Sequence, residues 1–135
     1  MKKHVFGRKL KRDKNQRKAL FKGLISSFIL HGKMETTEAK AKAVKGKIDS
    51  LVTKVKKNNK IVAKRLISLY VAHNAIAKFI DEVVPSLTQR PGAYTTIVKL
   101  GRRLKDDAPM VLLSWVEEIK FKNKDAKKEV KELVS

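Results

Sequence analysis

The chain contains no cysteine among its 135 residues. This absence excludes disulfide frameworks, thiol nucleophiles and cysteine-based zinc sites, and it is compatible with a reducing compartment. No apolar run approaches the ~18 to 20 residues that cross a bilayer, and the first residues lack the apolar stretch and cleavage site of a secretory signal. We therefore expect a cytoplasmic protein with no membrane partner and no bound metal.

Acidic residues are scarce, with Asp and Glu numbering 13 against 33 Lys and Arg, which gives a formal charge of +20. Residues 1–65 hold 21 basic and 4 acidic side chains, whereas residues 66–135 hold 12 and 9. Blocks of like charge repel one another and are typical of segments that bind nucleic acid. The composition therefore predicts a polyanionic partner that is bound mainly by the amino-terminal half.

The first 24 residues, MKKHVFGRKLKRDKNQRKALFKGL, carry ten Lys or Arg and a single acidic residue, Asp13. Too few of them are apolar to bury a core, so we expect an extended arm over residues 1–14. Ordering such an arm costs on the order of 1 to 2 kcal/mol per residue, whereas an isolated surface salt bridge contributes only ~0 to 1 kcal/mol. A dense array of phosphates, approached closely at Gly7, would supply the missing contacts.

Apolar residues at three- and four-residue spacing predict four helices within a single globular domain over residues 15–118. The first helix ends at His31 and Gly32, and Thr37 is the expected N-cap of the second. The third stops near residues 73–74, and the fourth cannot continue far beyond Val84 because Pro85 follows. The core faces predicted for the four helices, in chain order, are Leu20, Phe21, Leu24, Ile25, Phe28 and Ile29; Ala41, Val44, Ile48, Leu51, Val52 and Val55; Ile61, Val62, Leu66, Leu69 and Tyr70; and Ile76, Phe79, Ile80 and Val83.

Residues 94–100 and 110–116 are rich in β-branched and apolar residues and predict two antiparallel strands, with a third strand near residues 34–36. The segment MVLLSWV is almost continuously apolar, so we expect both of its faces to be covered, with helices on one side. The predicted fold is α+β: about four helices packed on one face of a small mixed three-stranded sheet. For the charged tail, residues 119–135, a marginal helix and a disordered end both stay open.

Motifs for catalysis and for ligand binding are weak. Gly32-Lys33 lacks the preceding glycine and the following hydroxyl of a phosphate-binding loop. His31 and His73 have no partner at the helical spacing that a metal site needs. The sequence therefore predicts no enzyme, no cofactor and no small-molecule substrate.

Short motifs in one order along residues 2–117 resemble the bacterial-type large-subunit ribosomal protein seventeen family. The first motifs lie in the basic arm and the first two helices. The longest lies just before and within the strand predicted over residues 94–100. The motifs are His4, Gly7-Arg8, Leu10 and Arg12; Arg17–Phe21; Thr36-Thr37 with Ala39–Lys42; Arg90–Ile97; Lys99–Gly101; and Asp107–Met110.

The resemblance implies a structural constituent of the large ribosomal subunit, which binds large-subunit ribosomal RNA near the peptide exit tunnel and beside neighbouring ribosomal proteins. Thr96 stands where the family usually has an arginine, so no RNA contact is carried over to it. The tail beyond Glu118 lies outside the resemblance. The predicted RNA-binding residues are Lys2, Lys3, His4, Gly7, Arg8, Lys9, Lys11, Arg12, Lys14, Arg17, Lys18 and Lys22, with a second cluster of Arg90, Tyr94, Lys99, Arg102 and Arg103.

Two other functions also fit the charge. A nucleoid-type protein that binds DNA without sequence specificity is the main alternative, because charge alone does not distinguish RNA from DNA. A peripheral membrane protein would need a basic amphipathic helix, but the apolar face of the first helix is equally well explained by a core. A helix-turn-helix over residues 59–84 is disfavoured, because its second helix begins with few side chains able to read bases.

Overall fold

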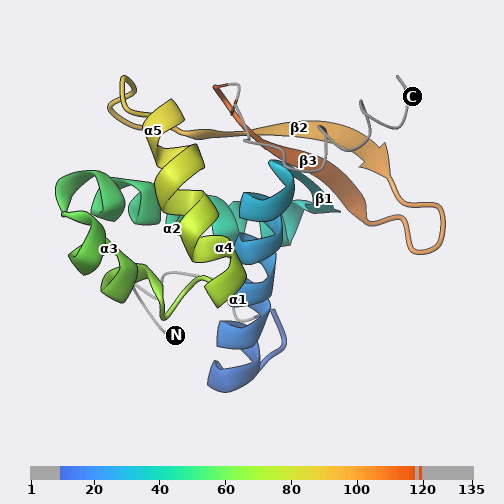
Figure 1. Ribbon diagram of the computed structural model, residues 1–135. Coiled ribbons are helices and arrows are strands. Elements are labelled where there is room, and N and C mark those ends of the chain that lie inside the picture. The colour runs from blue at the N-terminus through green and yellow to red at the C-terminus, as the bar shows by residue number, and fades with distance from the viewer. Residues whose placement is uncertain (1–9, 118, 120–135) are drawn as a thin grey trace, which may run out of the picture.

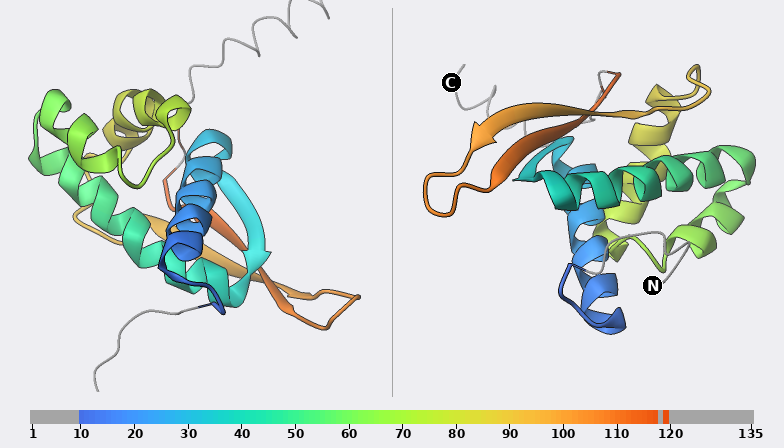
Figure 2. Two further views of the ribbon diagram at one scale, coloured as in Figure 1. Left: turned by 90° about the horizontal axis from the view of Figure 1, so that it is seen from below. Right: turned by 180° about the vertical axis from the view of Figure 1, so that it is seen from behind.

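Helices α1 and α2 lie against one face of a three-stranded sheet in the computed structural model, which describes residues 10–117 and Ile119 (Figure 1). The remaining helical segments cover the side of α1 and α2 away from the β2–β3 turn (Figure 2). The elements are α1 (Lys14–His31), β1 (Lys33–Thr37), α2 (Glu38–Lys57), α3 (Lys60–Ile67), α4 (His73–Lys78), the π-helical η1 (Phe79–Val83), α5 (Val84–Ser86), β2 (Thr95–Arg102) and β3 (Pro109–Trp115). The α+β fold predicted from the sequence is confirmed.

The two ends of α1 are capped, whereas the start of α2 has no side-chain cap. Asp13 accepts a hydrogen bond from the Gln16 amide, and the Gln16 side chain accepts one from the Asp13 amide, which forms a capping box at the start of α1. Gly32 ends α1 in the left-handed conformation, with φ of 78°. Thr37 stands at the N-cap of α2 as predicted, but its side chain makes no capping hydrogen bond.

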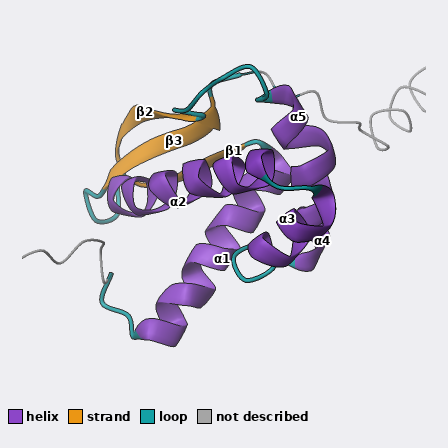
Figure 3. Ribbon diagram, turned by 90° about the vertical axis from the view of Figure 1, so that its left-hand side faces the viewer, coloured by secondary structure: helices purple, strands orange, loops and turns teal. Residues whose placement is uncertain are grey.

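The sheet has the strand order β1-β3-β2 and is antiparallel throughout, so the prediction of a mixed sheet was wrong. A tight hairpin makes β2 and β3 antiparallel, but no local signal sets the direction of the five-residue β1. That direction follows from the packing of α1 and α2, which β1 joins (Figure 3). A bulge between Lys99 and Gly101, where Gly101 has φ of 107°, bends β2 before the hairpin turn.

Only one face of β3 is covered, which corrects the expectation that both would be. Val111, Leu113 and Trp115 are buried, whereas the alternating residues Met110 and Leu112 are partly exposed. The helices all pack on the inner face, and nothing among the described residues covers the outer one. The continuous apolar run therefore did not report burial on both sides.

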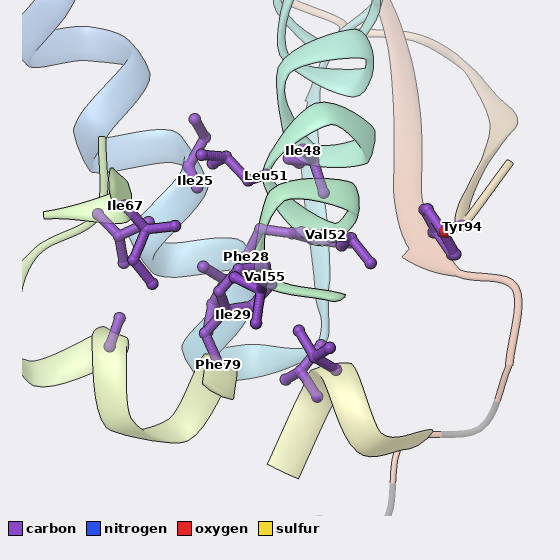
Figure 4. Packing of buried hydrophobic residues seen from close by; sticks show 14 of the residues in the cluster. Ile25, Phe28, Ile29, Ile48, Leu51, Val52, Val55, Ile67, Phe79 and Tyr94 are labelled. Carbon is purple, nitrogen blue, oxygen red and sulfur yellow. The ribbon is translucent and has the colours of Figure 1, made fainter. Parts of the chain in front are cut away.

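The core forms where α1 and α2 meet the sheet and the helices from α3 to α5 (Figure 4). Phe28 of α1 stacks at a tilt on Trp115 of β3, with 4.5 Å between ring centroids. Every core position predicted for α2 is buried. The helical periodicity of α2 was therefore sufficient to define its inner face.

Helix α3 buries a different face from the predicted one. Ala63, Ile67 and Val71 are buried, while the predicted core residues of this segment are exposed. The small Ala63 allows α3 to pack closely on α2, and the short helix then turns its larger apolar side chains outward. Those exposed residues are Ile61, Val62, Leu66, Leu69 and Tyr70.

The fourth helical segment continues past Pro85 only as far as Ser86, so it ends close to Val84 as predicted. The Val84 amide donates to the Phe79 carbonyl, five residues back, in the π-helical turn η1. Pro85 then occupies the first turn of α5, where a missing N–H is tolerated. The wider turn is what lets the helix accommodate proline.

Candidate nucleic-acid interface

Two arginines stabilise the turn through which the chain enters α1. Leu10 and Lys11 have positive φ angles of 52° and 54°. The Arg12 guanidinium donates to the Leu10 carbonyl at 3.0 Å, and the Arg17 guanidinium donates to the Arg12 carbonyl at 3.0 Å. Each guanidinium has five N–H donors, so both arginines keep donors for a phosphate while they hold the turn.

Four of the lysines predicted to bind RNA lie between residue 10 and the middle of α1; they are exposed, and none of them forms an ion pair with another described residue. The five ion pairs found among the described residues all lie elsewhere. Asp13, the acid nearest to these lysines in sequence, is engaged as the N-cap of α1. The exposed lysines are Lys11, Lys14, Lys18 and Lys22.

A second helix adds positive charge beside α1. The Lys47 ammonium of α2 lies 3.9 Å from the centroid of the Phe21 ring of α1. Burial lowers the pKa of Lys47, and the positive charge of Arg17 lowers it further. The fold therefore brings cations of α1 and α2 together, and we call Lys14, Arg17, Lys18, Lys22 and Lys47 the basic face.

The other predicted contacts of the amino-terminal arm lie outside the described residues. They are Lys2, Lys3, His4, Gly7, Arg8 and Lys9. Their part in RNA binding stays a prediction.

The second predicted cluster differs from the basic face because acids neutralise most of it. Arg90 pairs with Glu117 at 3.1 Å. At the β2–β3 turn, Arg102 and Arg103 each pair with an acid of the same turn, Asp107 at 3.2 Å and Asp106 at 2.7 Å. The hydrogen bonds from Arg103 lower the pKa of Asp106 to about 2. Of this cluster, only Lys99 is an exposed cation without an ion pair among the described residues.

Tyr94 is buried, with 2% of its surface exposed, so its ring cannot stack on an RNA base in this structure. The Lys56 ammonium covers the ring at 4.5 Å from its centroid and also donates to the Arg90 carbonyl at 2.6 Å. The prediction that Tyr94 contacts RNA is therefore withdrawn. Its position at the start of a strand did not reveal that α2 packs over it.

Lys47 and Lys54 of α2 and Tyr70 after α3 were missed as candidates. The Lys54 ammonium lies 5.3 Å from the centroid of the Tyr70 ring, and Tyr70 as a whole residue is 39% exposed. Lys47, Ser50 and Lys54 recur at three- and four-residue spacing, which was the available signal for one face of a helix. Tyr70 gave no such signal, because its apolar neighbours made it look like a core residue.

Neither a metal centre nor a membrane span is present in the described part of the chain. Residues 10–117 contain no group of three His, Cys, Asp or Glu side chains placed to hold a metal ion. Within the same residues, no helix combines the length and the apolar character needed to cross a bilayer.

Comparison with known proteins gives a consistent result. Residues 20–116 match the family model described as "Ribosomal protein L17". The chain is 39% identical over 131 residues to the large ribosomal subunit protein bL17 of Thermodesulfovibrio yellowstonii. The aligned region covers 97% of this chain and 98% of that protein. The chain is 40% identical over 110 residues to the protein of the same name from Natranaerobius thermophilus, covering 82% and 97%. For the one from Syntrophotalea carbinolica, the identity is 35% over 112 residues, covering 83% and 72%.

Proposed function

Because this chain belongs to the ribosomal protein L17 family, we propose that its basic face binds the ribosomal RNA of the large subunit. Members of the family are structural components of the ribosome in the cytoplasm, not enzymes. The proposal therefore concerns which surface binds the RNA and by what physical means.

The observation that carries the proposal is the clustering of like charges between α1 and α2. Arg17 and Lys47 lie close enough for the first to lower the pKa of the second. Like charges at close range destabilise one another in the free protein, and no acid among the described residues pairs with either. A phosphate placed between them would remove that repulsion and stabilise both charges.

The proposed contacts run from the arm into the helical body. They comprise Lys11, Arg12 and the basic face, together with the arm residues Lys2, Lys3, His4, Gly7, Arg8 and Lys9. Arg90, Lys99, Arg102 and Arg103 are proposed as a second, weaker set because most of them are already paired. The division into an arm (1–14), a body (15–118) and a tail (119–135) stays a prediction.

The site on the subunit is part of the same proposal. We place the protein near the peptide exit tunnel, beside neighbouring large-subunit proteins, as the family resemblance implies. Chemical crosslinking in assembled subunits tests this, because crosslinks to proteins at the tunnel exit are expected. Crosslinks only to proteins remote from the exit would contradict the placement.

Sedimentation tests the choice of RNA over DNA. In a lysate treated with DNase at moderate salt, we expect the chain to stay with large ribosomal subunits. A DNA-binding protein of the nucleoid type would instead leave the pellet when the DNA is digested. If the chain neither sediments with large subunits nor is released by DNA digestion, but floats with anionic liposomes, the membrane alternative is supported.

Salt dependence tests the mechanism. Binding to large-subunit ribosomal RNA should weaken as salt rises, with a slope of roughly −0.7 to −0.9 per phosphate neutralised, because each contact releases counterions. Affinity that does not change with salt would show that phosphate contacts do not drive binding.

A further inference from the structure

A groove of about 280 Å³ lies on α2 beside the residues that follow α3. In the right-hand view of Figure 2, α2 runs across the front of the molecule, and the first turns of α1 and the whole of α3 lie below it. The groove is open on one side and is lined by Gly46, Lys47, Ser50, Leu51, Lys54 and Tyr70.

Helix α2 has two polar sides with different surroundings. On one side, Lys56 is held against the Arg90 carbonyl and the Tyr94 ring. On the other side, Lys47 and Lys54 line the groove, and neither has an ion pair among the described residues. The second side is therefore the one whose charge remains available to a partner.

Tyr70 provides an accessible aromatic ring at the edge of this groove. It is 39% exposed, whereas Tyr94 is 2% exposed. The Lys54 ammonium lies 5.3 Å from the centroid of the Tyr70 ring. Because the Lys54 ammonium lies over one face of the ring, a base would stack on the opposite face, with this cation close to it for its own phosphate.

Gly46 leaves the groove open at its other rim. A Cβ atom added there would meet no heavy atom within 4 Å, so no packing inside the protein requires glycine. Glycine in a helix interior lowers helix stability relative to alanine. A bare backbone at this point lets a sugar-phosphate chain approach α2 closely.

We propose that this groove binds an unpaired nucleotide of RNA, with the base stacked on Tyr70 and the flanking phosphates at Lys47 and Lys54. Cations combined with an exposed aromatic ring are the combination that binds single strands, because every base has a face that can stack. A duplex keeps its bases stacked inside, so it offers no base face that could stack on Tyr70. The inference rests on the proposed function and adds a second, chemically different contact to it.

The direct test compares two adjacent residues of the full-length protein. Tyr70→Ala should weaken binding of a short oligouridine by about tenfold to a hundredfold, the range expected for loss of one stacking contact. Leu69→Ala is the matched control, because Leu69 is 73% exposed but does not line the groove. Neither variant should change binding of an RNA duplex by more than about twofold.

Two further variants keep the inference falsifiable if Tyr70→Ala disturbs the fold. Gly46→Leu should fill the groove and weaken oligouridine binding, with a melting temperature no lower than that of the parent chain. Lys54→Gln should remove one phosphate contact, so the dependence of oligouridine affinity on salt should become shallower by roughly 0.7, the slope per phosphate for single strands. Lys57→Gln, which is exposed on α2 outside the groove, should change oligouridine affinity less than Lys54→Gln does.

The outcomes separate this inference from the proposed function. Equal effects of Tyr70→Ala and Leu69→Ala on oligouridine would overturn the nucleotide site but leave ribosomal RNA binding intact. A crosslink from Tyr70 to a neighbouring protein in assembled subunits would also overturn it, because the ring would then serve a protein contact. If the parent chain binds neither oligouridine nor ribosomal RNA, both proposals fall together.

Discussion

The basic face of α1 and α2 and the β2–β3 hairpin are both rich in cations, but the arginines of the hairpin are paired with acids, whereas no cation of the basic face is in an ion pair among the described residues. On the hairpin, Arg102 and Arg103 each pair with an aspartate of the same turn. On the basic face, Arg17 and Lys47 repel one another without any acid between them among the described residues. The number of cations in a segment therefore does not say how much charge the fold leaves for a partner.

The difference arises from where the acids lie. The hairpin turn places Asp106 and Asp107 three and five residues after their arginines, and the turn brings each pair together. The only acid in the first 34 residues is Asp13, which caps α1. Helix α1 itself contains no acid, so Lys14, Lys18 and Lys22 have no acid partner within their own helix.

The two regions also differ in how firmly the core supports them. Phe28 of α1 is fully buried against Trp115, whereas Leu104 at the hairpin turn is fully exposed. The hairpin turn projects beyond the helices, as Figure 1 shows. The basic face is thus carried on a packed helix, and the hairpin turn is carried only by its own strands.

The largest effect that we expect is on stability. Phe28→Ala should lower the free energy of unfolding by about 3 to 5 kcal/mol, because it removes a fully buried ring. Leu104→Ala should change it by no more than about 0.5 kcal/mol. Chemical denaturation followed by circular dichroism measures both. Similar losses for the two variants would show that the hairpin turn is part of the cooperative core.

The next effect concerns RNA affinity. Replacing Lys14, Lys18 and Lys22 together with Gln should reduce the salt slope of ribosomal RNA binding by about 2 to 3, because three phosphate contacts are lost. Replacing Arg102 and Arg103 with Gln should reduce it by less than about 1, since both are already paired with acids. Filter binding over a range of salt concentrations measures both slopes. If the hairpin variant reduced the salt slope more than the α1 variant, the hairpin and not the basic face would be the main phosphate-binding region.

Removing the acids of the hairpin should make the two regions more alike. Asp106→Asn with Asp107→Asn frees both arginines, so we expect the salt slope of RNA binding to steepen by about 1 to 2. Asp81→Asn is the matched control, since Asp81 pairs with Lys60 at 3.0 Å, away from the hairpin. No change in slope for the double variant would mean that the hairpin faces away from the RNA.

The smallest effect is a titration. The pKa of Asp106 is about 2 in the folded protein because Arg103 donates hydrogen bonds to its carboxylate. The contribution of this pair is present above the usual aspartate pKa of about 3.9 and is lost as the pH falls through about 2. In Arg103→Gln, the carboxyl signal of Asp106 followed by NMR should titrate at a higher pH. An unchanged midpoint would show that Arg103 does not set the charge state of Asp106.

Much of the fold followed from local patterns. The limits of α1, the inner face of α2 and the pairing of the two late strands were predicted correctly, because regular spacing and end residues such as Gly32 act within a few residues. Two features were predicted wrongly: which residues of α3 are buried, and whether the outer face of β3 is covered. Whether Leu66 or Ala63 faces inward depends on the helix that α3 meets, not on α3 itself.

The candidate site divides in the same way. The sequence indicated the cation-rich helix α1, but its candidate residues included Tyr94 and not Tyr70. The structure buries the first ring under Lys56 and leaves the second beside an open groove. Exposure is a property of the packed assembly of elements, so a single segment cannot reveal it.

By itself, the sequence determined that this protein carries a large positive charge at one end and folds around amphipathic helices, since charge and periodicity are properties of neighbouring residues. Only the tertiary structure decided that Arg90 meets Glu117, which like charges meet across α1 and α2, and which aromatic ring faces solvent. These depend on distances between residues far apart in the chain, and electrostatic and packing energies are set by those distances.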